Sequence, residues 1–360
     1  MNRELFFLSE WGDNPERAWS GIMYNLYNVL SDYYNVHSID LTQKRSLFER
    51  IHNRLEPDSG FYRKTMKTRR FLNGKLPEGD KLTIFQFAET ICDTTNIDTY
   101  IYQDVSALFV QYLMEKEPCT FELSNFRGAS YDSIKKRANL QRKYYDGCKG
   151  VFTMGKWLSK FLIDNEIVRS DKVFHVGGGI NLDKSVIDYS NKKGKRILFV
   201  GRDFVRKGGQ LVIEAFKILK KTRKDVELYL AGPITNPVLE QIEGYHFIGD
   251  CDYKKTAELF NLCDVFCMPS YFEAYGIVFI EALCFGLPVI GRDAYEMPYI
   301  VKDGKSGLLL SNNSPSELAN MIEKTLEDKE MAYYVREHQQ DYLDRYSWDA
   351  VGKRIYNIIG

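Results

Sequence analysis

Short apolar runs alternate with longer amphipathic stretches along most of the chain. Apolar runs that end at glycine or polar residues are typical of buried strands, whereas apolar residues spaced three and four apart are typical of helices. Strand-like runs lie at residues 5–8, 81–87, 99–102, 150–154, 172–176, 196–200, 226–231, 245–249 and 263–268. Helical spacing follows several of these runs, which predicts an α/β fold with parallel sheets.

The alternation starts afresh near the middle of the chain. Residues 186–195 are polar and rich in lysine, which is typical of a linker. A chain of 360 residues is also long for one domain and natural for two. We therefore expect two Rossmann-like doubly wound domains, at residues 1–185 and at residues 186–345.

A glycine-containing loop follows the first strand of each predicted domain. In the N-terminal domain the loop at residues 9–21 precedes a helix that we expect Ser20 to cap. In the C-terminal domain the strand at residues 196–200 is followed by a loop that contains Arg202 and Lys207. Ligands of doubly wound sheets bind beyond the carboxyl ends of the strands, so both loops are candidate binding sites.

Two glutamates bracket another loop in the C-terminal half. Glu273 follows the strand-like run at residues 263–268, and Glu281 lies within a helical pattern that begins near Gly276. Amides at the start of a helix and the helix dipole favour a phosphate or another anion, and glycine permits its close approach. Carboxylates on either side can accept hydrogen bonds from sugar hydroxyls. The pattern therefore suits a nucleotide sugar, with the amides on its diphosphate.

The stretch at residues 269–290 closely resembles the E-x7-E motif of the retaining glycosyltransferases of family 4, in the two-Rossmann-domain (GT-B) class. The pattern G-R-x4-K-G at residues 201–208 is similar to the family's donor-diphosphate loop. The resemblance covers nearly the whole chain and is strongest over residues 196–310. It implies two Rossmann-like domains that face a central crevice, with a C-terminal helix at residues 346–360 that packs back on the N-terminal domain.

The resemblance also implies an activity and a set of site residues. The protein would be a hexosyltransferase that moves a sugar from a nucleoside-diphosphate sugar to an acceptor hydroxyl with retention, in the synthesis of a surface glycan or glycolipid. The residues implied in catalysis are Arg202, Lys207, Glu273 and Asp104. The residues implied in donor binding are Gly21, Arg202, Lys207, Gly249, Tyr275, Gly276, Ile277 and Glu281.

Within that set, the family assigns separate parts of the donor to separate residues. Glu273 would face hydroxyls of the donor sugar and Glu281 the ribose, while Gly249 lies in the loop that would hold the nucleobase. The family's favoured route is front-face displacement, in which the leaving diphosphate takes the acceptor proton. The nucleotide sugar is a co-substrate, and we expect neither a cofactor nor a metal.

Two cations in the glycine loop suit a diphosphate. The guanidinium of Arg202 is a planar fork and the ammonium of Lys207 is a point charge, so together they match non-bridging oxygens and the charge of the leaving group. The alternative interpretation is a pair of solvated cationic side chains. Arg206 fits this alternative better than its neighbours do.

The two N-terminal candidates each have a structural alternative. The family often has paired glycines where this chain has Ser20 and Gly21, and a helix cap with a tight turn explains the same residues. Asp104 follows Gln103, which occupies a position where the family often has histidine, so no catalytic histidine is expected there. Asp104 is a candidate contact for the acceptor or the sugar and equally a candidate N-cap for a helix at residues 105–113.

A possible metal motif occurs between the two phosphate loops. Asp250 and Asp252 form a D-x-D pattern of the kind that binds metal in the other major glycosyltransferase fold. Asp252 also directly precedes a helical pattern at residues 253–262, where it is expected to be an N-cap. We assign Asp250 to a turn and Asp252 to the cap, and we reject metal binding at this position.

Residues 44–75 are strongly basic on an otherwise neutral chain. Ten basic and three acidic residues give this segment a net charge of +7, whereas the whole chain has 49 of each kind. Aromatic residues are interleaved with the charges, which indicates an anionic partner, either a membrane surface or an anionic acceptor glycan. A solvated helical pair that covers the sheet explains the pattern equally well.

Composition narrows the environment of the protein. The balanced charge gives no indication of nucleic-acid binding, and the seven scattered cysteines without a C-x2-C pair are typical of a reduced cytosolic protein. The sequence lacks a transmembrane-length apolar run and a signal-peptide pattern. We expect a cytoplasmic protein that uses a glycan or a lipid-linked acceptor, with peripheral attachment to the inner face of the membrane if residues 44–75 bind lipid.

Two rival functions share the expected fold. A nucleotide-sugar epimerase would need acid and base groups around the sugar ring, and Gln103 argues against one of them. A non-catalytic scaffold that binds a carbohydrate or a partner would be expected to lose Arg202, Lys207 or a glutamate, yet all are present. The resemblance therefore favours the glycosyltransferase.

Overall fold

The computed structural model describes residues 3–42, 72, 83–87, 97–190, 192 and 194–360. The chain divides into two compact units. The N-terminal unit comprises Met1–Glu122, Phe126–Gly179 and Trp348–Gly360. The C-terminal unit comprises Leu123–Asn125 and Ile180–Ser347. The main boundary between the units thus lies between Gly179 and Ile180, slightly before residues 186–195, which were predicted to be a linker.

The N-terminal unit is built on a parallel sheet, which has six strands within the described residues, in the order β2-β1-β3-β4-β5-β6. The strands are β1 (Glu4–Ser9), β2 (Asn35–Asp40), β3 (Thr83–Phe87), β4 (Asp98–Gln103), β5 (Gly150–Thr153) and β6 (Val173–His175). The helical segments along this part of the chain are η1 (Pro15–Gly21), α1 (Ile22–Ser31), α4 (Ala107–Lys116), α5 (Pro118–Leu123), α6 (Tyr131–Gly147), α7 (Lys156–Asp164) and η2 (Ser170–Lys172). Central strands such as β3 are buried along their whole length, because helices cover both faces of a parallel sheet.

The last helix of the chain, α15 (Trp348–Ile359), packs against α1 within the N-terminal unit. The rings of Tyr33 and Tyr356 stack with their centroids 4.8 Å apart. A Cβ atom at Gly352 would lie 2.6 Å from Cγ2 of Val29, so only glycine allows the two helices to approach this closely. The end of the chain therefore completes the N-terminal unit.

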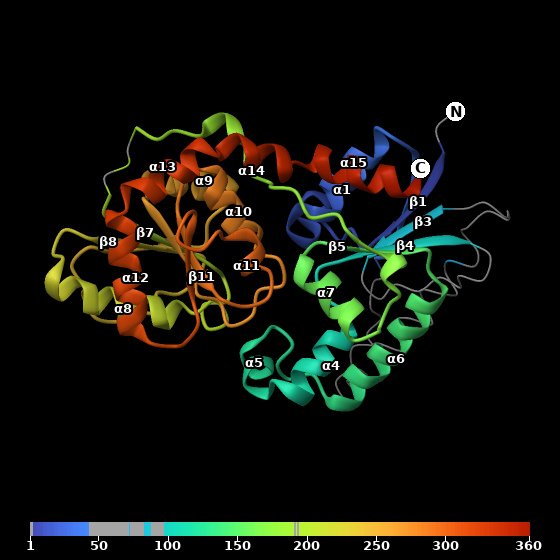
Figure 1. Ribbon diagram of the computed structural model, residues 1–360, viewed down its shortest axis with the longest axis horizontal. Helices are drawn as coiled ribbons and strands as arrows, with labels where there is room; N and C mark the ends of the chain where they lie inside the picture. The colour runs from blue at the N-terminus through green and yellow to red at the C-terminus, as the bar shows by residue number, and fades with distance from the viewer. Residues whose placement is uncertain (1–2, 43–71, 73–82, 88–96, 191, 193) are drawn as a thin grey trace. The chain divides into compact units, whose positions relative to one another are not determined.

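The C-terminal unit has a second parallel sheet, again with six strands among the described residues, in the order β12-β11-β10-β7-β8-β9. The strands are β7 (Arg196–Val200), β8 (Glu227–Ala231), β9 (Tyr245–Gly249), β10 (Val265–Cys267), β11 (Val289–Arg292) and β12 (Gly307–Leu310). The helical segments are η3 (Lys184–Val186), α8 (Gly209–Thr222), α9 (Tyr253–Leu262), α10 (Ile277–Cys284), α11 (Met297–Ile300), α12 (Pro315–Glu327), α13 (Lys329–Glu337) and α14 (Gln339–Arg345). Helices α8 and α12 lie together on one face of the sheet, and α9 and α10 lie on the other (Figure 1).

Both sheets change winding direction at one pair of neighbouring strands. In the N-terminal unit this pair is β1 and β3, and in the C-terminal unit it is β7 and β10. The loops that leave two such strands diverge to opposite faces, which opens a crevice at the carboxyl edge of the sheet. The fold therefore brings the loop after β7 and the loop after β10 together in the C-terminal unit.

The structure confirms the doubly wound α/β class. Each strand-like run of the sequence contains a strand of the structure, although residues 81 and 82 lie outside the described part of the chain. Three strands of the described residues, β2, β11 and β12, were not predicted, and β2 was missed because its residues are mostly exposed and lack an apolar run. Within the described part of the chain, every helix is too short or too polar to cross a bilayer.

Candidate functional site

The loops after β7 and β10 lie in direct contact in the C-terminal unit. The amide of Tyr271 donates a hydrogen bond to the carbonyl of Arg206 at 2.9 Å. Gly208 has a φ of +72°, and a Cβ atom there would lie 2.5 Å from the carbonyl oxygen of Pro269. Glycine at this position is therefore required both by the backbone conformation and by the close approach of the two loops.

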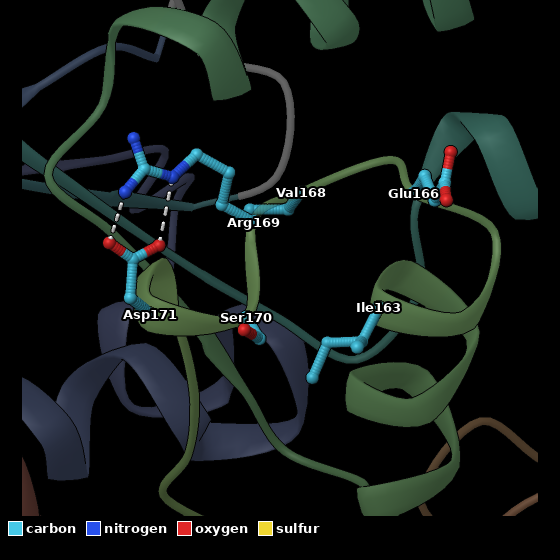
Figure 2. A pocket seen from close by; sticks show the side chains of 6 residues that line it. All are labelled: Ile163, Glu166, Val168, Arg169, Ser170 and Asp171. Atoms are coloured by element: carbon cyan, nitrogen blue, oxygen red, sulfur yellow. Dashed lines mark hydrogen bonds and ion pairs between the residues drawn. The ribbon is translucent and has the colours of Figure 1, made fainter.

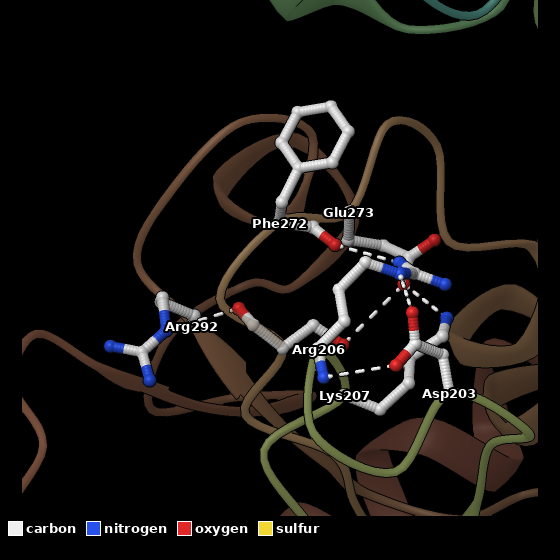
Figure 3. Close-up of polar contacts among 7 residues, drawn as sticks. Asp203, Arg206, Lys207, Phe272, Glu273 and Arg292 are labelled. Carbon is white, nitrogen blue, oxygen red and sulfur yellow. Dashed lines mark hydrogen bonds and ion pairs between the residues drawn. The ribbon is translucent and has the colours of Figure 1, made fainter. Parts of the chain in front are cut away.

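The centre of this contact is an ion pair between Lys207 and Glu273 (Figure 3). Their side chains are only 13% and 14% exposed, and Oγ of Ser270 lies 3.4 Å from the same carboxylate oxygen, Oε2. Burial lowers the pKa of Lys207, and the neighbouring Glu273 carboxylate partly offsets that change. The sequence predicted both residues as site residues, and the fold brings them together.

Arg206 is the second cation beside Glu273. Its Nη1 lies 3.6 Å from Oε2 of Glu273 and donates to the carbonyl of Phe272 at 2.8 Å, while Nε lies 3.3 Å from the Asp203 carboxylate (Figure 3). The Arg206 side chain is 16% exposed. The interpretation of Arg206 as a solvated cation is therefore wrong, because the loop after β10 covers it.

Arg202 is placed differently from Lys207. Its side chain is 76% exposed and forms two hydrogen bonds with Asp250, from Nε at 2.8 Å and from Nη2 at 3.4 Å. The two cations of the glycine loop thus differ in burial, and each is paired with a carboxylate. A ligand anion would need to replace Asp250 at Arg202 and Glu273 at Lys207.

The D-x-D pattern has a structural explanation at both positions. Asp252 caps α9 and accepts a hydrogen bond from the amide of Lys255 at 2.8 Å, as the sequence predicted. Asp250 accepts from Arg202 in the way just described. Within the described residues, no group of three or more His, Cys, Asp or Glu side chains is arranged to hold a metal ion.

Helix α10 begins directly after the Glu273 loop. Gly276 is its N-cap with a φ of +79°, and Ile277 is its first residue. A Cβ atom at Gly276 would lie 2.5 Å from Cε of Met297, so glycine is needed for space as well as for backbone conformation. Tyr275 is buried. The start of this helix offers amides and a positive dipole end next to Glu273.

Glu281 lies inside α10 and is 5% exposed. One of its oxygens, Oε1, accepts a hydrogen bond from the amide of Asn181 at 3.2 Å. Burial raises the pKa of Glu281 to about 7, although the Asn181 amide favours the charged form. Glu281 is therefore a buried carboxyl group at a helix whose N-terminus faces the candidate site.

Gly249 ends the edge strand β9 with a φ of +79°. Its carbonyl accepts a hydrogen bond from the amide of Gly232 at 2.7 Å. A Cβ atom at Gly232 would lie 2.5 Å from the carbonyl carbon of Gly201. Three glycines therefore permit the turns at the ends of β7, β8 and β9 to pack closely at the carboxyl edge of the sheet.

In the N-terminal unit, the loop after β1 has an unusual backbone. Trp19 and Ser20 have positive φ values of 45° and 57°, and Gly21 follows with a φ of 83° as the N-cap of α1. The prediction that Ser20 caps the helix is wrong by one residue, because Ser20 itself adopts the left-handed conformation. Left-handed residues other than glycine are uncommon, and strained backbone conformations of this kind cluster at active sites and ligand clamps.

The cap predicted at Asp104 is also misplaced. Ser106 is the N-cap of α4 and accepts a hydrogen bond from the amide of Phe109 at 3.0 Å. Gln103 is buried and donates from Nε2 to the hydroxyl of Tyr145 at 2.6 Å, while its Oε1 accepts from Gln141 at 3.2 Å.

Gln103 therefore has a structural role at the end of β4. Asp104, which follows it, lies half-buried at the carboxyl edge of the N-terminal sheet. Gly21 lies at the same edge, so the structure places the two N-terminal candidates at the carboxyl ends of β4 and, after the loop, of β1.

Arg292 is a residue of this region that the sequence analysis missed. Nε and Nη2 donate to the carbonyls of Ser270 and Pro269 at 3.0 and 3.2 Å, and the guanidinium lies 4.7 Å from the ring centroid of Tyr271. Arg292 thus supports the loop that carries Glu273 (Figure 3). The available signal was a charged residue at the end of the apolar run that forms β11.

A separate hollow of about 570 Å³ lies at the end of α7, beside the segment that leads into η2 (Figure 2). The residues that line it are Ile163, Glu166, Val168, Arg169, Ser170 and Asp171. Arg169 and Asp171 pair with each other there, at 2.6 and 3.1 Å. None of the site residues predicted from the sequence lines this hollow.

The prediction about residues 44–75 lies outside the described residues, apart from Leu72. Leu72 is buried in a cluster with Phe6, Leu8, Leu41 and Ile84.

Comparisons with known proteins agree with the fold, and a family model matches most of the C-terminal unit. Residues 184–341 match the family model described as "Glycosyl transferases group 1". D-inositol 3-phosphate glycosyltransferase of Corynebacterium kroppenstedtii is 27% identical over 177 residues, which are 45% of this chain and 39% of that protein. The chain spans between 39% and 60% of the length of this relative and two other curated glycosyltransferases.

Two solved structures share the fold. Sucrose-phosphate synthase from Thermosynechococcus elongatus has a TM-score of 0.70 and 16% identity, covering 99% of this chain and 98% of its own. Alr3699/HepE of Anabaena, solved in complex with UDP and glucose, has a TM-score of 0.64 and 15% identity, covering 99% of both chains. The GT-B class expected from the sequence is thereby confirmed as the fold of this protein.

Proposed function

We propose that this protein is a retaining glycosyltransferase that moves a sugar from a nucleoside-diphosphate sugar to an acceptor hydroxyl. The observation that supports this proposal most is the largely buried pair of Lys207 and Glu273 in the loops that follow β7 and β10. A doubly wound sheet binds its ligand at this point, and here the point lies beside the N-terminus of α10. The match of residues 184–341 to a glycosyltransferase family supports the same reaction class.

The donor diphosphate is proposed to bind Lys207 and the first amides of α10. An ammonium and a helix N-terminus both favour an anion, and they are worth more in a partly dry site than in water. Arg202 adds a second, more exposed cation after it leaves Asp250. These groups stabilise the negative charge that develops on the diphosphate as it departs.

The two glutamates are proposed to hold the sugar parts of the donor. Oε2 of Glu273 is the oxygen that faces Lys207, Arg206 and Ser270, whereas Oε1 accepts no hydrogen bond from the described residues. Oε1 is therefore suited to a hydroxyl of the donor sugar. Glu281 is proposed to accept from the ribose and Gly249 to border the nucleobase, with Tyr275 and Ile277 framing the phosphates.

The proposed step is a front-face displacement. The bond from the anomeric carbon to the diphosphate oxygen breaks, and a bond from the same carbon to the acceptor oxygen forms on the same face. The acceptor proton passes to the leaving diphosphate oxygen, so neither glutamate needs to act as a nucleophile. The protein contributes orientation and charge stabilisation.

Acceptor binding is proposed for the carboxyl edge of the N-terminal sheet, where Gly21 and Asp104 lie. The left-handed backbone at Trp19 and Ser20 supports a binding role for this loop. The acceptor is proposed to be a glycan or a lipid-linked sugar. No metal cofactor is part of the proposal, because Asp252 serves as a helix cap and Asp250 pairs with Arg202.

A panel of nucleotide sugars tests this function. Wild-type protein is incubated with UDP-, GDP- and ADP-linked sugars, and release of the nucleoside diphosphate is followed with and without EDTA. We expect release from at least one donor, undiminished by EDTA, and its loss in Glu273→Gln. A protein that releases no diphosphate from any donor, or that needs Mg²⁺ or Mn²⁺ to do so, would contradict the proposal.

A further inference from the structure

The proposed function gives the Lys207 ammonium two partners in succession. In this structure it is paired with Glu273, and the function requires the same group to bind the donor diphosphate. When Lys207 turns to the diphosphate, the Glu273 carboxylate loses its closest cation. A carboxylate that is only 14% exposed is energetically unfavourable without a compensating positive charge, because it has lost most of its hydration.

A second cation is already in position beside that carboxylate. Nη1 of Arg206 lies 3.6 Å from Oε2 of Glu273. Arg206 is anchored by bonds that do not involve Lys207, to the Phe272 carbonyl at 2.8 Å and to Asp203 at 3.3 Å. Its position is therefore independent of where the Lys207 side chain points.

We propose that Arg206 is a positioning residue that compensates the charge of the Glu273 carboxylate and holds it in place while Lys207 moves from Glu273 to the donor diphosphate. This inference rests on the proposed function. It makes donor binding depend on a cation that contacts neither the diphosphate nor the sugar. It also explains why this loop carries two adjacent cations that are both directed at one carboxylate.

The positive charge of Arg206 is the property that the proposal requires. A lysine at this position would retain a charge near Glu273 but would lose the paired hydrogen bonds of the guanidinium. A glutamine would lose the charge. If Arg206 served only to brace the loop through Phe272 and Asp203, lysine and glutamine would be similarly harmful.

Binding of UDP, GDP and ADP, measured by titration calorimetry, tests the inference, because these ligands supply the diphosphate without the sugar that Glu273 would contact. We expect Arg206→Gln to raise the dissociation constant of the nucleotide that wild type binds about tenfold. This is the cost of losing one charge-assisted contact, here the one between Arg206 and Glu273. Arg206→Lys should stay within about threefold of wild type. Arg223→Gln is the matched control, because Arg223 is also ion-paired in the C-terminal unit, with Asp225 and Glu327, and should leave binding unchanged.

A double-mutant cycle separates charge compensation from loop structure. In the Glu273→Gln background there is no carboxylate to compensate, so Arg206→Gln should cause no further loss of nucleotide binding. Equal losses in both backgrounds, or a loss in Arg206→Lys as large as in Arg206→Gln, would overturn the inference. Thermal unfolding of each variant monitors folding. If Arg206→Gln does not fold, the affinity of Arg206→Lys decides: a value within about threefold of wild type supports the inference, and a larger loss overturns it.

Failure of the proposed function has a different signature. Wild-type protein would then bind none of the three nucleotides, or Lys207→Met would bind as tightly as wild type. If wild type binds a nucleotide and Lys207→Met does not, the proposed contact between Lys207 and the diphosphate is supported. The behaviour of the Arg206 variants then decides the inference alone.

Discussion

Lys207 lies in a closely packed environment within the candidate site. Its side chain is largely buried and is paired with Glu273, and Gly201 leaves room for it, since a Cβ atom at Gly201 would lie 2.8 Å from Cγ of Lys207. Arg202, by contrast, is mostly exposed and paired with an exposed aspartate. Contacts in a dry site contribute more than contacts that water and salt screen.

The two cations should therefore differ in their importance for donor use. We predict that Lys207→Ala lowers kcat/KM for the donor. The fall should correspond to a loss of about 1.5–3 kcal/mol of transition-state stabilisation, the cost of one charge-assisted contact. Arg202→Ala should cost about 1 kcal/mol or less, because its contact is screened. Steady-state kinetics with thermal unfolding as a control checks both values, and wild-type turnover in Lys207→Ala would remove Lys207 from the site.

The pH dependence of donor use should also report on Lys207. Burial lowers its pKa, so the ammonium loses its proton at a lower pH than an exposed lysine does. Binding of the diphosphate needs the charged form, and kcat/KM should fall as pH rises through this lowered value. The Glu273 carboxylate raises the pKa of Lys207 and the Arg206 cation lowers it, with Asp203 a further raising influence.

The sign of each effect gives the prediction. In Glu273→Gln the alkaline fall in residual activity should move to lower pH, and in Arg206→Gln it should move to higher pH. Profiles of kcat/KM against pH, with circular dichroism to verify folding, measure both shifts. An alkaline limb that stays at the same pH in both variants would assign it to another group.

At the scale of secondary structure, Gly276 determines how α10 begins. Its φ of +79° strains any other residue, and a Cβ atom would also meet Cε of Met297 at 2.5 Å. We predict that Gly276→Ala lowers the free energy of unfolding by more than about 1 kcal/mol and weakens nucleotide binding. Denaturant unfolding and calorimetry measure the two effects.

Gly304 provides the matched control for this substitution. It has a φ of +73°, but no atom lies within 4 Å of a Cβ placed there. Gly304→Ala should therefore show the cost of backbone strain without the clash and should leave nucleotide binding intact. Equal destabilisation of the two variants would mean that the contact with Met297 adds nothing.

The elements could be predicted from sequence where a local pattern decides them. Apolar runs identified the central strands, and Asp252 was recognised as a cap because it directly precedes a helical pattern. The caps at Ser20 and Asp104 were displaced to Gly21 and Ser106, because serine, aspartate and glycine all suit an N-cap and local geometry chooses among neighbours.

Burial at the site could be predicted only in part. The motifs identified Lys207 and Glu273, and the strand order of a doubly wound sheet makes their loops neighbours. The burial of Arg206 depends on the Phe272 carbonyl, and the role of Arg292 depends on carbonyls of another loop. Such contacts join segments distant in sequence, and charge alone does not reveal them.

At the scale of the whole molecule, charge is unevenly distributed along the chain. Residues 44–75 carry +7 on a chain with zero net charge, so the remainder carries −7. A basic residue near an anionic bilayer contributes about 1 kcal/mol of attraction, which decays within a Debye length of about 10 Å. We therefore predict salt-dependent binding to anionic vesicles.

Co-sedimentation with anionic and neutral vesicles at low and high salt checks this prediction. Binding to anionic vesicles that is lost at high salt is expected, and a variant with glutamine at Lys64, Lys67, Arg69 and Arg70 should bind less. Binding that is equal on both vesicle types, or absent from both, would favour a soluble acceptor and a merely solvated segment.

The reaction itself is tested most directly by NMR of the sugar released from a nucleotide-sugar donor. Water can replace the acceptor in slow hydrolysis, so the measurement does not require the acceptor to be known. Recorded before mutarotation, the first sugar formed by wild-type protein should have the same anomeric configuration as the donor, and Lys207→Met should form it far more slowly. A product with inverted configuration, or formation of sugar at the same rate in Lys207→Met, would contradict a retaining transfer that depends on this site.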